Sequence, residues 1–381
     1  MKLTLFWFRR DLRLEDNTAL NAAMNSCSNV LPLFIFDENI LDELPDNDPR
    51  VNFIYDTLSS INQRLNEIQS SILILKGKPE EVWKGLIQTY DISSVYVNRD
   101  YEHYAIERDE KLAQLLLNNG IELLDFKDQV IHEKSDVTKA DGAPYTMFTP
   151  YKNKWLEHYT PTAILSEVDY GKFHNRQFVF PKLEDLGFRS STILVKPFSL
   201  EKVYQYAETR NFPYLDTTSY LSPHLRFGTV SIRQIIALLK NEDDVFLSEL
   251  IWREFFMQIL FHFPKVVNQN FRSKYDGIQW LNNETDFQKW CNGQTGYPLV
   301  DAGMRELNET GYMHNRVRMV AAGFLCKHLL IDWRWGEAYF AKKLLDYELS
   351  SNNGNWQWAA GTGCDAAPYF RIFNPIEQLK K

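Results

Sequence analysis

Residues 3–8, LTLFWF, form a short apolar run, and similar runs follow it at regular distances along the chain. Such runs, rich in aromatic and branched side chains, are typical of buried strands. The other predicted strands cover residues 30–36, 72–75, 94–98 and 121–126. Between the strands, stretches of helical period cover residues 16–26, 51–68, 79–89 and 103–119. Strands that alternate with helices predict an α/β domain with a parallel, five-stranded, doubly wound sheet.

The pattern changes after residue 126. Residues 127–200 show no clear alternation, so we expect a long connecting segment with a few short helices, packed between two domains. Helical periods predominate from residue 201 to the end. Candidate helices cover residues 201–210, 222–239, 245–262, 284–291, 298–309, 313–330 and 335–345. The predicted organisation is an α/β domain at 1–126, a linker at 127–200 and an all-α domain at 201–381.

The composition is typical of a soluble globular protein. The 381 residues are 44% hydrophobic with a mean hydropathy of −0.37, and no apolar run approaches the roughly 20 residues that span a bilayer. The N-terminus becomes charged within a few residues, unlike a secretory signal. The cysteines form no CxxC pair, which indicates a reducing compartment and no metal site. We therefore expect a cytoplasmic protein.

The net charge of −8 is unevenly distributed, because the acidic excess lies in residues 1–200 and residues 201–381 are balanced. An acidic chain is not an obvious nucleic-acid binder by bulk charge. Any contact with a polyanion would need a local basic patch in the second half.

Residues 350–371, SSNNGNWQWAAGTGCDAAPYFR, combine indoles, amides and glycines in a spacing that fits neither a helix nor a strand. Glycine allows a flat molecule to approach the backbone, asparagine supplies donors and acceptors, and indoles supply aromatic faces. The stretch predicts the wall of a pocket for a planar heteroaromatic ligand. A tryptophan-rich turn in the core is the structural alternative.

The predicted helix at 245–262 places Glu249, Trp252 and Arg253 on one face. Charged groups beside an indole suggest a site, because buried charges need partners. A surface ion pair between Glu249 and Arg253 is the alternative. At 311–319, Asn315, Arg318 and Met319 share a face in the same way.

Hydroxyl groups gather at residues 217–222, where a helix is expected to begin. A helix start offers free N–H groups that bind phosphate, although ordinary capping also explains serine and threonine there. Asp346 and Glu348 precede the aromatic stretch, where they could bind a sugar hydroxyl or a ring N–H; a solvated helix end is the alternative.

Six motifs in chain order resemble those of the photolyase/cryptochrome family. They are WFRRDLRLEDN, TSYLSPHLRFG, ELIWREFF, GYPLVDAGMREL, MHNRVRM and NNGNWQWAAGTGCDAAPYFRIFNP. The resemblance extends nearly end to end and is strongest to class I cyclobutane pyrimidine dimer photolyases. It implies an all-α FAD-binding domain after the α/β domain.

The resemblance also implies a role for individual residues. The implied cofactor-binding residues are Tyr206, Thr218, Ser219, Tyr220, Leu221, Ser222, Arg318, Asp346, Tyr347, Glu348 and Asn352, with Asn352 facing flavin N5. The implied electron-transfer residues are Trp290, Trp333 and Trp356. The implied catalytic residues of the lesion pocket are Glu249, Trp252, Asn315, Met319 and Trp358. The implied DNA-facing residues are Arg253, Arg316 and Arg371, and no metal is implied.

By the same resemblance, the protein is a light-dependent DNA-repair lyase in which reduced FAD donates an electron that splits a flipped pyrimidine dimer. A flavin photoreceptor of the cryptochrome type without repair activity is the alternative. Asn315 and Met319 stand where enzymes for (6-4) lesions have histidines, which argues against that substrate. We expect a monomer that associates with the nucleoid when bound to DNA.

The sequence departs from the family pattern in three places. Lys381 follows the FNP motif closely, whereas relatives usually continue for several dozen residues. Tyr220 and Phe246 stand where some relatives have Arg and Trp. Tyr104 and Ala105 replace the Asn-Glu pair that holds folate in some relatives, so a second, antenna chromophore is a deazaflavin, another flavin or absent.

Overall fold

The structure is a computed structural model that describes residues 2–379 apart from positions 28, 166, 241–242 and 369. Tyr369 of the aromatic stretch therefore lies outside the described residues. The chain folds into two compact units, each assembled from three segments. The first, here called the sheet unit, contains Met1–Ile131, Thr160–Val195 and His224–Leu238. The second, here called the helical unit, contains His132–Tyr159, Lys196–Pro223 and Leu239–Lys381.

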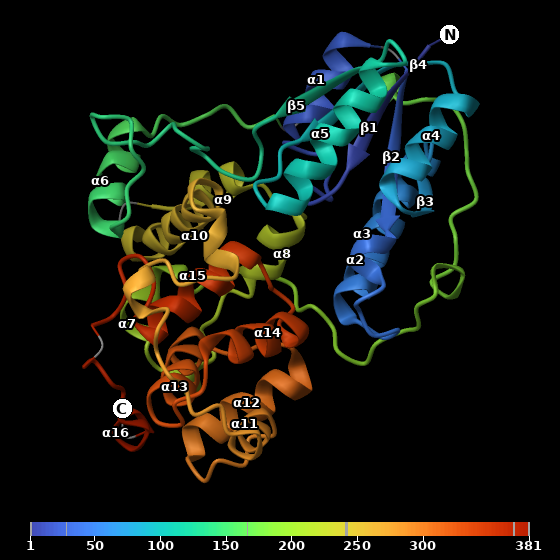
Figure 1. Ribbon diagram of the computed structural model, residues 1–381. Helices are drawn as coiled ribbons and strands as arrows, with labels where there is room; N and C mark the ends of the chain where they lie inside the picture. Colours follow the sequence, from blue (N-terminus) through green and yellow to red (C-terminus); the bar gives the residue numbers. More distant parts are fainter. Residues whose placement is uncertain (1, 28, 166, 241–242, 369, 380–381) are drawn as a thin grey trace. The chain divides into compact units, whose positions relative to one another are not determined.

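The sheet unit is built on five parallel strands in the order β3-β2-β1-β4-β5 (Figure 1). The chain winds outward from central β1 in both directions, which is the arrangement of a doubly wound sheet. The predicted fold class, an α/β domain with a separate all-α domain, is confirmed. The strands are β1 (Leu3–Phe8), β2 (Val30–Asp37), β3 (Leu73–Gly77), β4 (Ile92–Asn98) and β5 (Glu122–Phe126).

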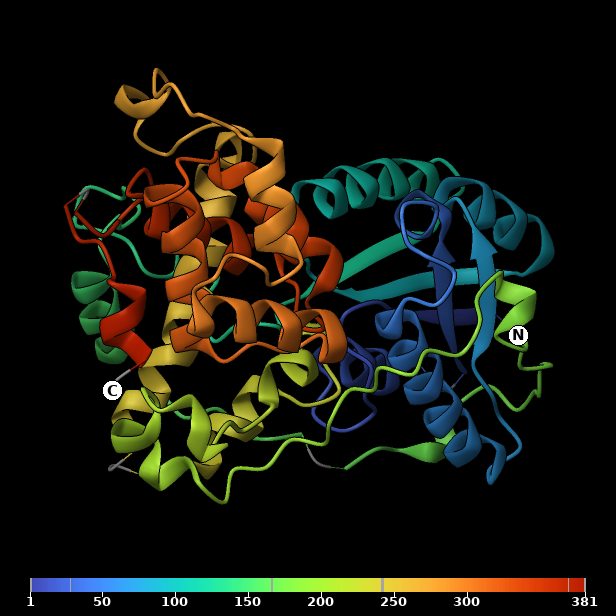
Figure 2. The same cartoon turned by 90° about the horizontal axis from the view of Figure 1, so that it is seen from below.

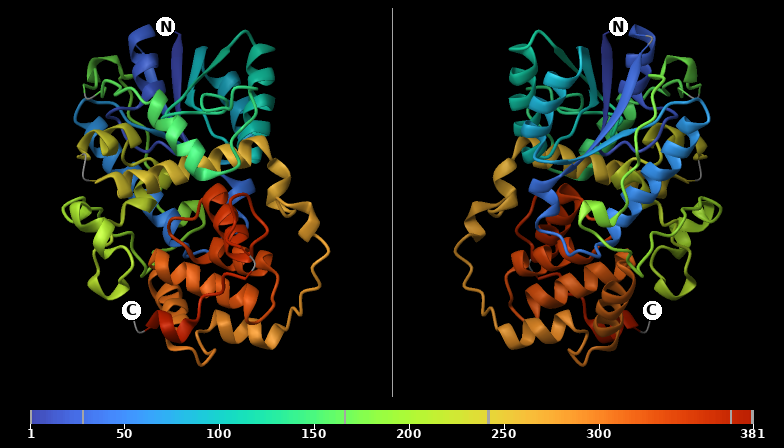
Figure 3. Two further views of the ribbon diagram at one scale, coloured as in Figure 1. Left: turned by 90° about the vertical axis from the view of Figure 1, so that its left-hand side faces the viewer. Right: turned by 90° about the vertical axis from the view of Figure 1, so that its right-hand side faces the viewer.

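Helices cover both faces of this sheet (Figure 3). They are α1 (Thr18–Ser26), α2 (Glu38–Leu41), α3 (Pro49–Asn66), α4 (Pro79–Thr89) and α5 (His103–Leu117). Leu5 and Trp7 of β1 pack with α4 and α5, whereas Phe6 and Phe8 pack with α1 and α3. β1 and β2 are buried on both faces, which explains their continuous apolar sequences.

A buried ion cluster anchors the loop after β1. Arg13 Nη2 donates to both carboxylate oxygens of Asp128, at 2.8 and 2.6 Å. Arg233 of α9 (Ile232–Leu238) donates to Asp128 Oδ1 at 2.8 Å and to Asp16 Oδ2 at 3.0 Å. Burial opposes ionisation of Asp128, but the two guanidinium groups lower its pKa to about 2. The cluster fastens a distant segment of the chain onto the sheet unit.

The prediction of one helix at 222–239 is wrong, because α8 (Leu221–Phe227) and α9 are separate helices. Gly228 lies between them with φ of 66°, in the left-handed region that favours glycine. A Cβ at this position would lie 2.1 Å from the backbone oxygen of Arg10. The chain therefore turns at the one residue that allows this approach.

The helical unit gathers its later helices into one bundle, orange and red in Figure 2. Within the described residues, none of the helices combines the length and apolar character needed to cross a membrane. The helices of this unit are α6 (Phe148–His158), α7 (Tyr206–Thr209), α10 (Asp244–His262), α11 (Glu284–Cys291), α12 (Pro298–Thr310), α13 (Asn315–Lys327), α14 (Trp333–Lys343), α15 (Leu349–Ala360) and α16 (Pro375–Leu379).

The interpretation of residues 350–371 as non-helical is wrong for their first half, which forms α15. This helix contacts α10, α13 and α14. Its buried residues include polar Asn353 and Gln357 as well as Trp356. A helix enclosed on several sides has no amphipathic stripe, so its period is hidden in the sequence. α15 ends at Gly361, which adopts φ of 88°.

Two glycines let α15 pack closely between its neighbours. A Cβ on Gly354 would lie 2.1 Å from the ring of Phe256 on α10. A Cβ on Gly336 of α14 would lie 2.1 Å from the ring of Trp356. Both distances are far inside van der Waals contact, so the three helices could not approach this closely with larger residues.

We predict that Gly354→Ala destabilises the protein by about 1–3 kcal/mol, since overpacking outweighs the better helix propensity of alanine. Gly85→Ala in α4 is the matched control, because nothing lies within 4 Å of the added methyl group. In that control the free energy of unfolding should rise by about 0.5–1 kcal/mol, because alanine has the higher helix propensity. Thermal unfolding of both variants measures the difference, and equal midpoints would contradict this account of the packing.

Candidate active site

The predicted site residues all lie in the helical unit, and half of them lie on α15 and the helices that contact it, α10, α13 and α14. α10 carries three of them, α13 carries four, and α15 carries three. The remaining residues lie on α7, α8, α11 and α14 or in the segments beside them. The structure thus brings together side chains that are far apart in the sequence, such as Ser222 and Asp346, which are hydrogen-bonded across a separation of 124 residues.

Glu249 of α10 forms an ion pair with Arg210, at 2.7 Å between Oε1 and Nη1. Burial raises the pKa of the Glu249 carboxyl group, while Arg210 and, more weakly, Lys152 act to lower it. Tyr206 lies beside this pair, with the Arg210 guanidinium 5.3 Å from its ring centre. The site therefore contains an acid whose protonation is favoured by burial and opposed by one arginine.

Trp252, one turn further along α10, lies in an aromatic cluster. Its indole stacks on the ring of Phe148 with centroids 3.7 Å apart and an interplanar angle of 8°. The ring of Phe256 lies 5.3 Å away at 29°. Trp252 is partly buried, so some of its surface remains accessible to a ligand.

Asn315 and Met319 lie one turn apart on α13, and Asn315 Nδ2 is 4.0 Å from Met319 Sδ. Arg316 donates a hydrogen bond to Asn211 Oδ1. Trp358 of α15 is partly buried, and the exposed Arg371 guanidinium lies 5.9 Å from its ring centre. These residues combine amide, thioether, indole and cationic groups, which suit an uncharged base next to a phosphate.

Asp346 joins two of the predicted cofactor-binding groups. Its Oδ2 accepts hydrogen bonds from Ser222 Oγ at 2.7 Å and from Arg318 Nη2 at 2.9 Å. Its Oδ1 is buried and has no hydrogen-bond partner among the described residues. A buried carboxylate oxygen without a donor is costly, so this atom fits a ligand that supplies a hydroxyl or N–H group, as the sugar and ring of FAD do.

The segment before α8 makes a second group of contacts. Tyr220 adopts φ of 54° and donates from Oη to Asp216 Oδ1 at 2.6 Å. Lys196 Nζ donates to Tyr220 Oη at 2.9 Å. Ser219 Oγ accepts from the backbone N–H of Leu221 at 3.4 Å, whereas the side chain of Thr218 is exposed.

Glu348 is buried at the start of α15, where it interacts with Arg253 of α10 at 3.4 Å. The Arg253 side chain is only 12% exposed. Its guanidinium thus binds an internal carboxylate, and the assignment of Arg253 to DNA stays a prediction. Tyr347 packs against the apolar core formed by α11 to α15.

Asn352 donates from Nδ2 to Glu337 Oε1 at 2.8 Å and to the Glu337 backbone oxygen at 3.1 Å. Burial raises the pKa of Glu337, and its hydrogen bond from Asn352 acts to lower it. The interaction fixes the Asn352 amide between α14 and α15.

The three predicted electron-transfer tryptophans are all buried. The rings of Trp356 and Trp290 are in edge contact, with centroids 6.0 Å apart at 71°. Within the described residues, Trp333 has no such ring contact with either of them, and its Nε1 donates to Asn270 Oδ1 at 2.9 Å.

Sequence reasoning missed Arg210, Glu337 and Phe148. Arg210 and Glu337 carry charge, but nothing in their spacing relates them to Glu249 or Asn352. Phe148 lies within residues 127–200, where the sequence pattern predicts a linker. The run YTMFTPY around it is aromatic, and this composition was the available signal.

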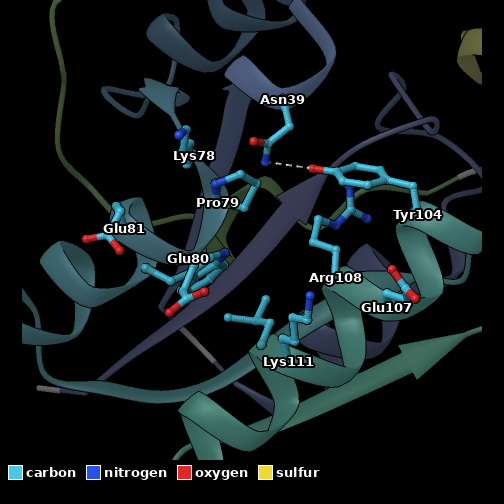
Figure 4. A pocket seen from close by; sticks show the side chains of 11 residues that line it. Asn39, Lys78, Pro79, Glu80, Glu81, Tyr104, Glu107, Arg108 and Lys111 are labelled. Atoms are coloured by element: carbon cyan, nitrogen blue, oxygen red, sulfur yellow. Dashed lines mark hydrogen bonds between the residues drawn. The ribbon is translucent and has the colours of Figure 1, made fainter.

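A separate cavity of about 240 Å³ lies in the sheet unit, at the ends of α4 and α5 (Figure 4). Its wall includes Trp83, whose buried Nε1–H has no hydrogen-bond partner among the described residues. Tyr104 Oη accepts from Asn39 Nδ2 at 3.1 Å. The charged lining residues are Lys78, Glu80, Glu81, Glu107, Arg108 and Lys111. The cavity fits a polar aromatic molecule.

We predict that Arg210→Gln raises the pKa of Glu249 further, because it removes both the opposite charge and the charged hydrogen-bond donor. Lys152→Gln should raise it less, since Lys152 acts only through its charge. Infrared titration of the carboxyl band, assigned by its loss in Glu249→Gln, measures the midpoint in each variant. An unchanged midpoint in Arg210→Gln would contradict the assigned cause.

Comparison with known proteins identifies the family of this chain. Residues 4–168 match the family profile described as DNA photolyase, and residues 246–381 match the FAD binding domain of DNA photolyase. The deoxyribodipyrimidine photo-lyase of Synechococcus sp. is 36% identical over 99% of this chain and 84% of its own length. That of Vibrio cholerae is 37% identical over 100% of this chain and 87% of its own length.

Solved structures of photolyases and cryptochromes are also similar to this chain. The photolyase from Sulfolobus tokodaii with two FAD molecules has a TM-score of 0.88 and 37% identity, over 100% of this chain and 87% of that one. The Synechocystis sp. cryptochrome has a TM-score of 0.84 and 26% identity, over 100% of this chain and 86% of that one. This chain belongs to the photolyase/cryptochrome family.

Proposed function

We propose that this protein is a deoxyribodipyrimidine photo-lyase that repairs cyclobutane pyrimidine dimers in ultraviolet-damaged DNA under blue light. The observation that carries the proposal is a group of two residue pairs: Glu249 and Trp252 lie one turn apart on α10, and Asn315 and Met319 lie one turn apart on α13. Signalling through a flavin requires no such group. The similarity to photo-lyases over nearly the whole chain supports the same conclusion.

The cofactor of the proposed enzyme is FAD, bound in the helical unit. When bound and reduced, it supplies an electron on absorbing light. Asp346 Oδ1 has no hydrogen-bond partner in the described part of the chain, and Arg318 and Ser222 hold the carboxylate in place. The residues that we propose to bind the cofactor are Tyr206, Thr218, Ser219, Tyr220, Leu221, Ser222, Arg318, Asp346, Tyr347, Glu348 and Asn352. The buried residues Trp290, Trp333 and Trp356 would conduct electrons to this site.

The substrate is a dimer of adjacent pyrimidines flipped out of the duplex, and damage lowers the cost of unstacking it. Trp252 and Trp358 present aromatic surface to the flipped bases. Burial favours the protonated form of Glu249, which can donate a hydrogen bond to a pyrimidine carbonyl. Such a donor stabilises negative charge on the ring during repair.

Contacts with the DNA backbone would come from cationic side chains. Arg371 is exposed and Arg316 partly exposed, and Arg253 is the third predicted residue of this set. Phosphate contacts would make binding depend on salt but not on base sequence. We propose that the protein acts as a monomer and associates with the nucleoid while bound to DNA.

The cavity of the sheet unit is the proposed site of a second chromophore that gathers light. Its aromatic and polar groups suit a heteroaromatic ring, and the photolyase from Sulfolobus tokodaii holds two FAD molecules. The identity of this chromophore stays open.

The direct test is repair of an irradiated oligonucleotide that contains thymine dimers. We predict that blue light restores its absorbance at the base band when the FAD-loaded, reduced protein is present, and that darkness does not. Binding of FAD without any recovery in light would support a photoreceptor instead.

A second prediction concerns Glu249. Glu249→Ala should lower the repair yield per absorbed photon several-fold with little change in DNA affinity, because it removes the hydrogen-bond donor. Glu249→Gln retains a donor and should keep more of the yield. The exposed acid Glu208 of α7 provides the control Glu208→Ala, which should repair normally. Equal yields in Glu249→Ala and the control would remove Glu249 from the mechanism.

A further inference from the structure

Phe148 is the first residue of α6, in the segment that sequence analysis assigned to a linker. The described structure places α6 in the helical unit, against α10. The Phe148 side chain is 8% exposed, so it belongs to the packed interior of this unit.

The contact between Phe148 and Trp252 is unusually close. Aromatic pairs in proteins are commonly offset or edge-on, with centroids about 4.5–7 Å apart. Here the centroids are 3.7 Å apart and the planes differ by 8°. Because the distance between the centroids is about the thickness of an aromatic ring, the Phe148 ring lies directly over the indole with almost no lateral offset. Phe148 therefore covers one face of the indole.

Three further contacts hold α6 in this position. The backbone N–H of Phe148 donates to Asp365 Oδ2 at 2.9 Å. Lys152 Nζ donates to Ser248 Oγ of α10 at 2.7 Å, and Trp155 Nε1 donates to the buried carboxylate of Glu254 at 2.6 Å. Because residues 148, 152 and 155 share one helical face, α6 is fixed to α10 along its length.

We propose that Phe148 is a positioning residue of the lesion pocket, which fixes the plane of Trp252 so that the remaining indole surface meets the flipped pyrimidines. This inference rests on the proposed function. Without the Phe148 ring, the Trp252 side chain can reorient, and binding of a dimer must then restrict it. This entropic cost weakens the binding of damaged DNA alone, because undamaged duplex keeps its bases stacked and does not bring them to Trp252.

The test uses the FAD-loaded full chain and Phe148→Leu, which keeps an apolar side chain but removes the ring. Phe148→Tyr restores a ring and is the rescue variant. Tyr159→Leu is the matched control, because Tyr159 follows α6 and stacks on Trp155 at 5.1 Å and 12°, away from Trp252. Should Phe148→Leu fail to fold, Phe148→Met replaces it in both measurements.

The first measurement compares the Kd for an oligonucleotide containing one thymine dimer with the Kd for the undamaged duplex. Phe148→Leu should raise the first Kd roughly 3- to 10-fold, the value of one aromatic contact, and leave the second unchanged. Phe148→Tyr and Tyr159→Leu should match the parent protein. Equal Kd values for damaged DNA in Phe148→Leu and the parent protein would overturn the proposal.

The second measurement does not depend on DNA. Protein labelled with 5-fluorotryptophan gives a fluorine resonance for Trp252, assigned by its loss in Trp252→Phe. Phe148→Leu should shift and broaden this resonance, because the ring current above the indole is lost and the indole becomes mobile. Tyr159→Leu should leave it in place. An unchanged resonance in Phe148→Leu would also overturn the proposal.

Different results would refute the proposed function and the role of Phe148. If the parent protein does not prefer damaged DNA, the proposed function fails and this inference fails with it. If the parent protein prefers damaged DNA and Phe148→Leu does so equally, only the role of Phe148 is refuted.

Discussion

The close packing of α15 against α10 and α14 is the constraint on which the candidate site depends. Gly354 admits the ring of Phe256, and Gly336 admits the ring of Trp356. This contact brings the polar start of α15, including Asn352, into the same region as α10 and α14. Because interiors are close-packed, one added methyl group at either glycine would move a helix that carries site residues.

Charge balance is the second feature of the site. Glu249, Glu348 and Asp346 each bind an arginine, namely Arg210, Arg253 and Arg318. These pairs offset the cost of desolvating carboxylates in the unit that holds FAD. The three pairs leave their carboxylates in different states. One oxygen of the Asp346 carboxylate has no hydrogen-bond partner among the residues that the structure describes, whereas burial raises the pKa of Glu249 despite its arginine.

The sequence predicted the sheet and most of the helices, because apolar runs such as residues 3–8 and amphipathic stretches such as residues 298–309 give strong signals. It failed where tertiary contacts decide the structure. α15 has no amphipathic stripe because it is enclosed, and Gly228 breaks a helical period because the backbone of Arg10 lies against it. In the same way, Glu249 and Trp252 could be proposed from their spacing, but their partners Arg210 and Phe148 could not, since sequence separation conceals such contacts.

The most direct measurement of the central claim is the action spectrum of dimer repair by the purified protein. If the helical unit holds FAD beside a lesion pocket, the rate of dimer loss in protein that carries no second chromophore must follow the absorption bands of the bound flavin. It must also vanish when FAD is removed and return when FAD is added back. Dimer loss that persists after FAD is removed would contradict the account. So would a lack of dimer loss in illuminated protein that is fully loaded with reduced FAD.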